Sequence, residues 1–508
     1  MLAREGRLSL AILQSRAQLG TDAPPVTIEV FLSGGLPSFS VVGMAETAVR
    51  ESKDRVRSAL ISSDFKFPQE RITVSLGPAD MRKSGGRFDL AIALGILAAS
   101  NQLPLEAVNG VEFYGELALN GDLRQVPAIL PAALKANDSG HSMIVPLPNA
   151  SEAALAKTVV RPATTLLEVT AHLNGSHSID KMDSVRPGVA RAAAPDLADV
   201  KGQAQAKRAL EIAAAGGHNL LFIGPPGTGK SMLARRLAGV LPVMTEAEAL
   251  ETAAIDSVLG RTLDLTRWRR RPFRSPHHTA SPAALVGGGP GPRPGEISRA
   301  HNGVLFLDEL PEFNRNVLEV LREPLEAGVI TIARAGRQAD FPANFQLVAA
   351  MNPCPCGYLG DLAADCCCSA ERVATYRSKI SGPLLDRIDL HVEVRRPPKQ
   401  ALRSDAPAGE SSSEVAERVR AARDIQLRRS RLCNARLEGQ SLTDVCSVSG
   451  EALQLLENAT DKFSLSARAY QRVLRVARTI ADLVMQEDIA APHIAEALSL
   501  RQLNKRRL

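Results

Sequence analysis

Alternating apolar and polar positions mark the first part of the chain. Apolar side chains recur at every second position over residues 26–32 and 72–76, which predicts two half-buried strands. Helical spacing over 47–62 predicts an amphipathic helix, and the apolar run Asp89–Ala99 predicts a buried one. Together with a further strand predicted at Ser142–Pro146, these elements indicate an α+β or α/β domain.

The middle of the chain alternates strands with helices. Apolar runs at Leu220–Ile223, 303–307 and 346–350 predict three buried strands, and helical spacing over 316–327 predicts a helix between the last two. Strands that alternate with helices in this way form a parallel sheet covered on both faces. This block is therefore predicted to be of the α/β class.

Helical spacing dominates the last hundred residues. The predicted helices are 414–432, 450–459, 466–486 and 491–502. Two segments rich in Pro, Ser and Ala predict linkers on either side of the central block. The predicted organisation is a first domain over 1–175, a linker over 176–195, a central domain over 196–395, a linker over 396–413 and a helical domain over 414–508.

The amino-acid composition is that of a globular protein rather than a membrane protein. The chain has 508 residues, of which 45% are hydrophobic and 23% charged, as in soluble globular proteins of several domains. No apolar stretch approaches the roughly 20 residues of a membrane span, and the first residues do not resemble a signal peptide. We therefore expect a cytoplasmic protein without membrane contact.

Positive charge is concentrated in one segment. The net charge of +6 is weak for this length, but residues 267–274 place five arginines around the only tryptophan, Trp268. Arginine beside aromatic residues suits phosphate contact and base stacking. A solvated surface run is the alternative interpretation.

A glycine-rich segment follows the first strand of the central block. Its residues are Gly224, Pro225, Pro226, Gly227, Thr228, Gly229, Lys230 and Ser231. They match the G-x-x-x-x-G-K-[ST] phosphate loop, in which backbone N–H groups surround the phosphates, the lysine reaches the β- and γ-phosphates, and the hydroxyl holds Mg²⁺. A helix start directly behind the loop adds a positive field. The sequence therefore predicts binding of ATP or GTP with Mg²⁺.

Polar residues also end the other two central strands. Asp308 and Glu309 follow the second strand, and Asn352 follows the third. In phosphate-loop enzymes an aspartate at this place holds Mg²⁺, and a glutamate next to it can polarise the attacking water. Asn352 can then reach between the γ-phosphate and that water. The alternative for the acidic pair is an ordinary exposed strand end.

Cysteines are clustered in one short segment. Five of the seven lie between residues 354 and 368, which in a reducing compartment favours metal binding over disulfides. We predict that Cys354, Cys356, Cys366 and Cys368 hold one structural Zn²⁺. Free thiols are the alternative.

The central block resembles the AAA+ ATPases, and several motifs narrow that resemblance. These motifs are Arg274-Ser-Pro-His277-His278-Thr, Pro294-Gly295-Glu296-Ile297-Ser298, Ala300-His301-Asn302-Gly303, Asn352-Pro-Cys354-Pro-Cys356-Gly and Leu384-Leu385-Asp386-Arg387-Ile388-Asp389. Together with Gly35-Leu-Pro-Ser-Phe39 in the first block, they are similar to the magnesium-chelatase-like ComM/YifB family. The resemblance spans nearly the whole chain.

This resemblance implies a fold and roles for two arginines. The implied fold is an α/β AAA+ phosphate-loop core with a Lon-protease-like α+β domain before it and a helical lid after it. By position, Arg387 corresponds to the arginine finger that completes a neighbouring subunit's site, and Arg468 to the lid arginine that senses nucleotide. The alternatives are an intrachain ion pair of Arg387 with Asp386 or Asp389, and a solvated side chain at Arg468.

The resemblance also implies an activity. It points to a homo-hexameric ring with ATP-dependent helicase and branch-migration activity on single-stranded or branched DNA, acting in recombination during natural transformation. Residues 271–300 would then form a loop-like, mobile insertion that faces the pore, where His277 and His278 meet phosphate. A histidine pair that binds metal is the weaker interpretation, because no acid or cysteine lies at ligand spacing nearby.

Two other functions remain as alternatives. One is a chelatase-type ATPase that remodels a protein partner, although such subunits lack the long first domain. The other is a Lon-like ATP-dependent protease. Gly86-Arg87-Phe88-Asp89 stands where a serine–lysine protease would carry Pro-Ser-Ala-Gly, and Ser84 is out of register, so we predict a non-catalytic first domain.

Overall fold

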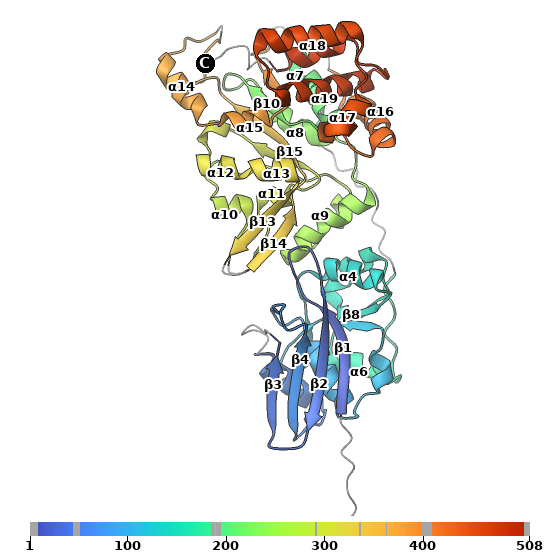
Figure 1. The fold of residues 1–508 in the computed structure, drawn as a ribbon. Helices are drawn as coiled ribbons and strands as arrows, with labels where there is room; N and C mark the ends of the chain where they lie inside the picture. Colours follow the sequence, from blue (N-terminus) through green and yellow to red (C-terminus); the bar gives the residue numbers. More distant parts are fainter. Residues whose placement is uncertain are drawn as a thin grey trace, which may run out of the picture. The chain divides into compact units, whose positions relative to one another are not determined.

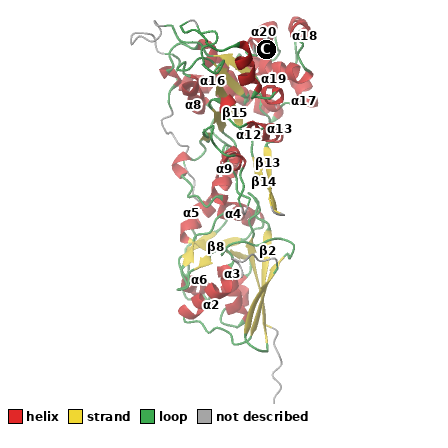
Figure 2. Ribbon diagram, turned by 90° about the vertical axis from the view of Figure 1, so that its left-hand side faces the viewer, coloured by secondary structure: helices red, strands yellow, loops and turns green. Residues whose placement is uncertain are grey.

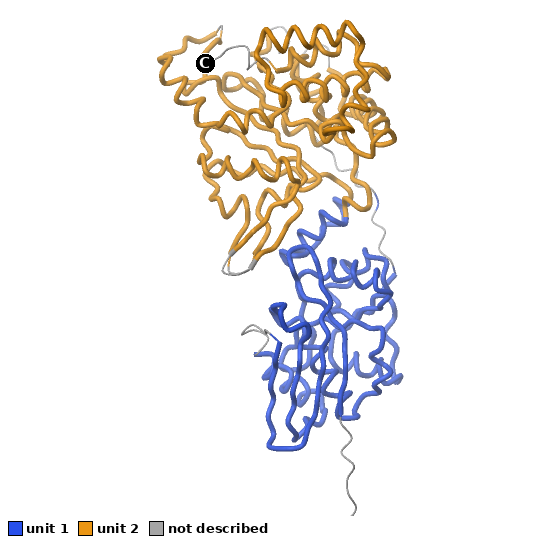
Figure 3. Tube along the Cα trace, viewed as in Figure 1, with its two compact units in different colours: residues 1–188, 250–268 blue, residues 189–249, 269–508 orange. Residues whose placement is uncertain are grey.

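The computed structural model is drawn in Figure 1 and, turned by 90°, in Figure 2. It describes residues 9–43, 51–183, 188, 195–289, 292–334, 337–361, 363–398 and 409–501. The chain divides into two compact units, distinguished by colour in Figure 3. Unit 1 comprises Met1–Gly188 and Leu250–Trp268, and unit 2 comprises Val189–Ala249 and Arg269–Leu508. The return of 250–268 to unit 1 differs from the continuous central domain predicted over 196–395.

Unit 1 is built on a mixed seven-stranded sheet in the order β3-β4-β2-β1-β5-β8-β9. The strands are β1 Ser9–Arg16, β2 Pro25–Ser33, β3 Ser38–Val42, β4 Arg71–Gly77, β5 Val111–Phe113, β8 Ser142–Pro146 and β9 Val160–Ala163. The three strands predicted here are confirmed as β2, β4 and β8. A separate hairpin joins β6 (Glu116–Leu117) to β7 (Leu123–Arg124).

The helices of unit 1 are α2 Ser52–Ser62, α3 Asp89–Ala99, α4 Ile129–Asp138, α5 Ala150–Ala153 and α6 Leu166–Leu173. The buried helix predicted at Asp89–Ala99 is confirmed, and every one of its residues is buried in the core of unit 1. Helix α2 occupies the second part of the predicted 47–62 helix. Residues 47–50 lie outside the described residues.

Unit 2 contains a five-stranded sheet in the order β11-β12-β15-β10-β16. Its strands are β10 Leu220–Ile223, β11 Phe273–Arg274, β12 Val304–Leu307, β15 Gln346–Met351 and β16 Leu390–Glu393. All pairings are parallel, which confirms the predicted parallel sheet. A separate antiparallel hairpin, β13 (Val329–Arg334) with β14 (Arg337–Pro342), was not predicted.

The remaining helices surround this sheet or follow it in sequence. They are α7 Ala204–Gly216, α8 Lys230–Val240, α9 Glu246–Val258, α10 Pro282–Val286, α11 Glu296–Arg299, α12 Arg315–Val320, α13 Arg322–Ala327, α14 Ala370–Ser378 and α15 Gly382–Asp386. Helix α9 starts in unit 2 and continues into unit 1. The helix predicted over 316–327 is divided into α12 and α13, because Pro324 has no N–H to donate and its ring would clash with the carbonyl of Val320.

The C-terminal region is helical, as predicted. Its helices are α16 Ser412–Ser430, α17 Gly439–Val445, α18 Gly450–Phe463, α19 Ala467–Leu483 and α20 Ala491–Ser499. Side chains of these helices share one hydrophobic core with α7, α8 and the parallel sheet. Residues 399–408 of the second predicted linker lie outside the described part of the chain, as do 184–187 and 189–194 of the first.

A buried ion pair fastens this helical region to the sheet. The guanidinium of Arg472 on α19 donates to a carboxylate oxygen of Asp389 at 2.6 Å, and Nδ1 of the buried His218 lies 3.5 Å from the other oxygen. Burial alone would raise the pKa of Asp389, but His218 and Arg472 outweigh burial and hold that pKa below its ordinary value. Asp389 also accepts from the backbone N–H of Asn219, next to β10.

We expect Arg472→Leu to destabilise unit 2 by about 3 kcal/mol at pH 7, because it leaves the Asp389 carboxylate buried without its cation. A group whose folded pKa is lowered contributes its full stability above its unfolded pKa, about 3.9 for aspartate, and loses it progressively as the pH falls from there toward the folded pKa. The difference from wild type should therefore be almost complete at about pH 4 and clearly smaller at about pH 2.5. Urea unfolding at pH 7 and at about pH 2.5 measures both effects.

Arg468→Leu is the matched control, because Arg468 is exposed one turn earlier on the same helix. It should change the unfolding free energy by less than about 0.5 kcal/mol. Equal losses for the two variants would contradict the role given to the Arg472–Asp389 pair.

Candidate active site

The phosphate loop connects strand β10 to helix α8, as its sequence predicts. Gly224 begins the loop, and its N–H donates to the Met351 carbonyl of the adjacent strand β15 at 3.2 Å. A side chain at this position would collide with the Val394 carbonyl, so only glycine fits. Within the loop, the Thr228 hydroxyl donates to the Pro225 carbonyl at 2.9 Å. The loop is thus bonded to the adjacent strand where it begins and is braced by an internal hydrogen bond.

Lys230 points back into this loop. Its ammonium donates to the carbonyls of Gly224 at 2.6 Å and Pro225 at 2.9 Å, and to Oδ1 of Asn352 at 3.1 Å. Burial lowers the pKa of Lys230, and the negative charges of Asp308 and Glu309 oppose that shift. A phosphate in the loop would supply the negative charge that this half-desolvated ammonium lacks.

Ser231 and Asp308 bring two oxygen ligands together. The Ser231 hydroxyl donates to Oδ2 of Asp308 at 2.6 Å, although the two residues are 77 positions apart. Mg²⁺ prefers oxygen ligands, and it is held by one or two carboxylates together with phosphates in sites of this kind. The donor set present here therefore fits the predicted magnesium ion. Asp308 and Ser231 would hold the ion beside the loop.

The strand order explains why these residues meet. Strand β15 lies between β12 and β10, and the three strands run parallel. Their carboxyl ends therefore share one edge of the sheet, where ligands bind in open α/β sheets. Asp308 follows β12, Asn352 follows β15, and the phosphate loop follows β10. The structure brings all of these predicted site residues together.

Glu309 is beside them but faces a different partner. Its backbone is left-handed, with φ of 53°, and Oε2 of its carboxylate lies 3.2 Å from Nδ1 of His278. His278 is on the segment that follows edge strand β11, on the side of β12 away from the phosphate loop. The contact with His278 therefore holds the Glu309 carboxylate to the segment that follows β11.

The contact of His278 with Glu309 was not predicted. The rings of His277 and His278 lie 4.2 Å apart between centroids at an interplanar angle of 34°, and His278 is edge-on to Phe313. The contact of these two histidines with phosphate stays a prediction. The segment 271–300 contains β11, α10 and α11, and residues 290 and 291 fall outside the described residues. Sequence spacing gave no sign of the His278–Glu309 contact, which depends on the β11–β12 pairing.

Arg387 lies at the opposite edge of the sheet. It precedes β16, and its backbone carbonyl accepts from the side chain of Asn219 at the start of β10. The length of β10, about 13 Å for four residues, separates this edge from the phosphate loop of the same chain. The guanidinium is buried, donates to the Pro383 carbonyl and pairs with Glu326. The alternative partners named from the sequence, Asp386 and Asp389, are thus not the ones it has.

Arg468 is not part of the assembled site in this structure. It is exposed in the first turn of α19, and within the described ranges no hydrogen bond or ion pair joins it to the phosphate loop. Its assignment as a lid arginine that senses nucleotide stays a prediction from position.

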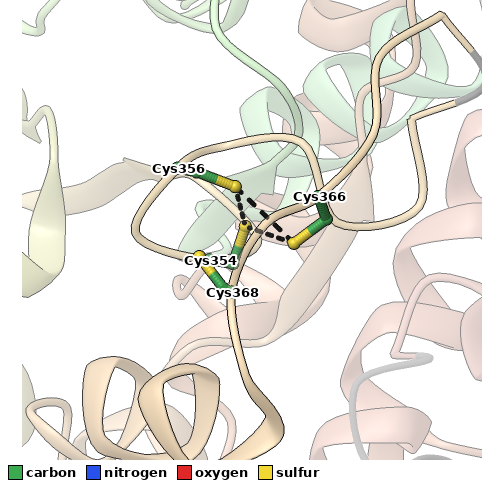
Figure 4. Close-up of side chains that lie close together, drawn as sticks. All are labelled: Cys354, Cys356, Cys366 and Cys368. Atoms are coloured by element: carbon green, nitrogen blue, oxygen red, sulfur yellow. Dashed lines mark hydrogen bonds between the residues drawn. The ribbon is translucent and has the colours of Figure 1, made fainter.

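The four predicted zinc ligands come together, as Figure 4 shows. The sulfur of Cys354 lies 3.3 Å from that of Cys356 and 3.6 Å from that of Cys366, and the sulfurs of all four, Cys368 included, lie within 4.8 Å of one another. Four sulfurs around a tetrahedral Zn²⁺, with Zn–S of about 2.3 Å, would be about 3.8 Å apart. The cluster therefore fits such a site. The backbone N–H of Tyr358, first among several donors, lowers the pKa of Cys356 to about 6.

The arginine-rich segment 267–274 is engaged within the chain. Arg269 donates to the Met244 carbonyl at 2.6 Å, Arg271 donates to the Asn302 carbonyl at 2.7 Å, and Arg274 pairs with Glu296 at 2.6 Å. Trp268 is buried. These contacts do not favour the nucleic-acid contact that we considered for the segment.

Ser84 is not paired with the neighbouring Lys83 in unit 1. Lys83 is buried and donates to the Pro78 carbonyl, whereas Ser84 is exposed. Asp89, at the start of the buried helix α3, is held by the Ser52 hydroxyl at 2.5 Å and by Arg55 at 2.7 Å. The non-catalytic character of the first domain stays a prediction.

Comparisons with known proteins cover nearly the whole chain. The family models described as "Subunit ChlI of Mg-chelatase", "Magnesium chelatase, subunit ChlI" and "Magnesium chelatase, subunit ChlI C-terminal" match residues 28–149, 196–402 and 409–501. The protein named Competence protein ComM of Haemophilus influenzae is 50% identical over 502 residues, which cover 98% of each chain. The chain belongs to the magnesium-chelatase ChlI-like ComM/YifB family.

Other relatives show how far the likeness extends. YifB of Salmonella typhimurium is 49% identical over 503 residues, 98% of each chain. The magnesium-chelatase 38 kDa subunit of Cereibacter sphaeroides is 26% identical over 220 residues, 39% of this chain and 58% of that one. The central and C-terminal parts thus form a magnesium-chelatase-type ATPase, in agreement with the assembled site. Among the described residues, no helix is both long and apolar enough to cross a bilayer.

We expect His278→Ala to raise the basal rate of ATP hydrolysis about fivefold, since it removes one hydrogen bond of about 1 kcal/mol that Glu309 must break before its carboxylate can act on the attacking water. The affinity for nucleotide should not change, because His278 does not touch the loop. Steady-state kinetics with ATP measures both quantities. His277→Ala is the control and should leave the rate at the wild-type value. A lower rate for His278→Ala would mean that His278 supports Glu309 in its working position instead.

Proposed function

We propose that this protein is an ATP-driven DNA motor that forms a ring and promotes strand separation and branch migration during recombination of incoming DNA, in the cytoplasm. The observation that carries the proposal is the 50% identity to a competence protein over 98% of both chains, unit 1 included. The magnesium-chelatase 38 kDa subunit of Cereibacter sphaeroides aligns with only 39% of this chain. The ATP site described above supplies the source of work.

Each site residue has a role in hydrolysis under this proposal. Lys230 and the loop N–H groups bind the β- and γ-phosphates, and Ser231 and Asp308 hold Mg²⁺, which neutralises charge on the phosphate oxygens. Asn352 lies 3.1 Å from the Lys230 ammonium and so borders the γ-phosphate position. Glu309, once released by His278, polarises the attacking water.

The central test is ATP hydrolysis by the purified chain with and without forked, three-stranded or four-way DNA. We expect stimulation of several-fold or more by branched or single-stranded DNA. Glu309→Gln should abolish turnover but retain nucleotide binding, since it removes the base and keeps the loop. A rate of ATP hydrolysis that none of these DNA structures changes would contradict the motor proposal and favour remodelling of a protein partner. Cleavage of casein would favour a protease.

We further infer that Arg387 acts on the neighbouring subunit's nucleotide in a homo-hexamer. Its place at the amino edge of the sheet puts it about 13 Å from its own loop, so it cannot reach its own γ-phosphate without large rearrangement. An arginine in such a position can complete a site across a subunit interface. The pair with Glu326 would have to open to free the guanidinium.

Mixing two inactive variants tests action across the interface. A Lys230→Ala subunit cannot hydrolyse ATP in its own phosphate loop but still offers Arg387 to its neighbour. An Arg387→Ala subunit has an intact phosphate loop but offers no arginine finger. When equal amounts are mixed, about one site in four joins an intact loop to an intact finger, so about a quarter of the wild-type rate should return. Each variant alone is the control. No recovery, in mixtures shown by light scattering to contain mixed rings, would contradict action in trans.

We also infer that the four-cysteine cluster binds one structural zinc ion. The sulfur positions fit a closed tetrahedral site, and closed Cys₄ sites are structural rather than catalytic. Cys354 is completely buried, whereas Cys367, the fifth cysteine of this segment, is exposed and outside the cluster.

A further inference from the structure

The loop that carries the four cysteines lies against the phosphate loop. It runs from Cys354, directly after β15, to Cys368, just before α14. We propose that the zinc-loaded cysteine loop is a supporting part of the ATP site, and that it fixes Pro226 of the phosphate loop and Asn352 in their working positions. This inference rests on the proposed ATPase and zinc site, and assigns the metal a role in nucleotide binding.

One close approach between the two loops is that of Gly357 to Pro226. Gly357 has φ of +87°, and a Cβ at this position would lie 2.8 Å from Cδ of Pro226 and 3.8 Å from Cγ of Asn352. The backbone of the cysteine loop thus packs directly on one residue that surrounds the phosphates and on one that borders them. A glycine is required for both the backbone angle and the space.

Asn352 is positioned by the two residues that follow it in sequence. Two residues after it, the buried Cys354 enters the cluster and its sulfur accepts from the backbone N–H of Leu359 at 3.3 Å. Between them, the Pro353 carbonyl accepts from Nε of Arg377 on α14 at 3.1 Å. The direction of the Asn352 side chain toward Lys230 therefore depends on the fold of the cysteine loop.

A second anchor ties the loop to the far side of the phosphate loop. The Asp361 carboxylate, almost completely buried, pairs with Nε of Arg396 at 2.8 Å. Arg396 follows β16, and β16 pairs with β10 on the side opposite β15. The cysteine loop thus starts after β15, one neighbour of β10, and is bonded to Arg396 after β16, the other neighbour. It spans the end of the strand from which the phosphate loop emerges.

The loop has little else to hold it in this shape. Several of its residues are exposed, among them Leu359, Ala363, Asp365 and Cys367, so burial of apolar surface contributes little. Without a metal ion, the four cysteines offer each other only weak sulfur hydrogen bonds, whereas thiolates bound to one zinc ion supply folding free energy directly. Because a misplacement of about 1 Å can cost about a hundredfold in rate, loss of the zinc ion would disable the neighbouring site.

The experiment compares cysteines inside and outside the cluster, in the full chain and without DNA. Zinc content is measured by plasma mass spectrometry, and affinity for a fluorescent ADP analogue by titration. Wild type should carry about one zinc ion per chain. Cys366→Ser and Cys368→Ser should lose the ion and bind the analogue at least about tenfold more weakly, while Cys367→Ser should match wild type in both measurements.

Gly357→Ala keeps all four ligands and tests the contact itself. It should retain zinc and the wild-type circular dichroism spectrum, yet bind the analogue several-fold more weakly, because its Cβ displaces Pro226. This variant keeps the inference testable even if the serine variants do not fold.

The results separate this inference from the proposed function. Wild type without zinc, or zinc-free variants with unchanged affinity for the analogue, would overturn it. Binding of nucleotide that depends on zinc, combined with hydrolysis that no DNA stimulates, would support the cysteine loop's role and contradict only the DNA motor.

Discussion

The parallel pairing of β12, β15 and β10 is the constraint on which the site depends. Because the three strands run the same way, the residues that follow them meet at one edge, although 77 positions separate Ser231 from Asp308. The hydrogen bond between these two side chains, at 2.6 Å, and the three bonds of the Lys230 ammonium are the result. Displacement of any strand would separate the residues that we assign to the phosphates, the metal ion and the attacking water.

The same sheet gives its two edges different partners. The carboxyl edge carries the nucleotide site, with the cysteine loop on one part of it and the His278 segment beyond Glu309. The amino edge carries Arg387, and Asp389 two residues later connects it to Arg472 of the C-terminal helices. In a ring, the amino edge of one subunit's sheet would lie against the nucleotide bound by its neighbour. A change at that nucleotide on hydrolysis could then be transmitted through residues 387–389 to the C-terminal helices. This arrangement is the physical basis of the motor that we propose.

Features that depend on neighbouring residues in sequence could be predicted. The phosphate loop combines a buried strand, glycines and a helix start, and the helix Asp89–Ala99 is a continuous apolar run, so both are found where the sequence indicates. The grouping of Cys354, Cys356, Cys366 and Cys368 was predictable because the four cysteines lie within 15 positions, and the structure confirms that their sulfurs meet. Pro324 could have predicted the break between α12 and α13, but the helical spacing on both sides of it obscured that signal.

Features that depend on tertiary pairing could not be predicted. The contact of His278 with Glu309 requires β11 to pair with β12, and β11 is only two residues long. The return of 250–268 to unit 1 has no compositional boundary, since it begins within helix α9. The arginines of 267–274 looked like a surface patch because their partners, such as Glu296 and the carbonyl of Met244, lie 22 to 25 positions away.

The most direct test of the central claim is branch migration itself. A four-way DNA junction with one labelled arm would be incubated with the purified chain and ATP, and the separated products followed by gel electrophoresis. The account predicts that the junction is resolved into two duplexes with ATP, and that it stays intact with a non-hydrolysable ATP analogue or with Glu309→Gln. An intact junction under conditions in which the wild-type chain hydrolyses ATP would contradict the claim that this ATPase drives DNA movement.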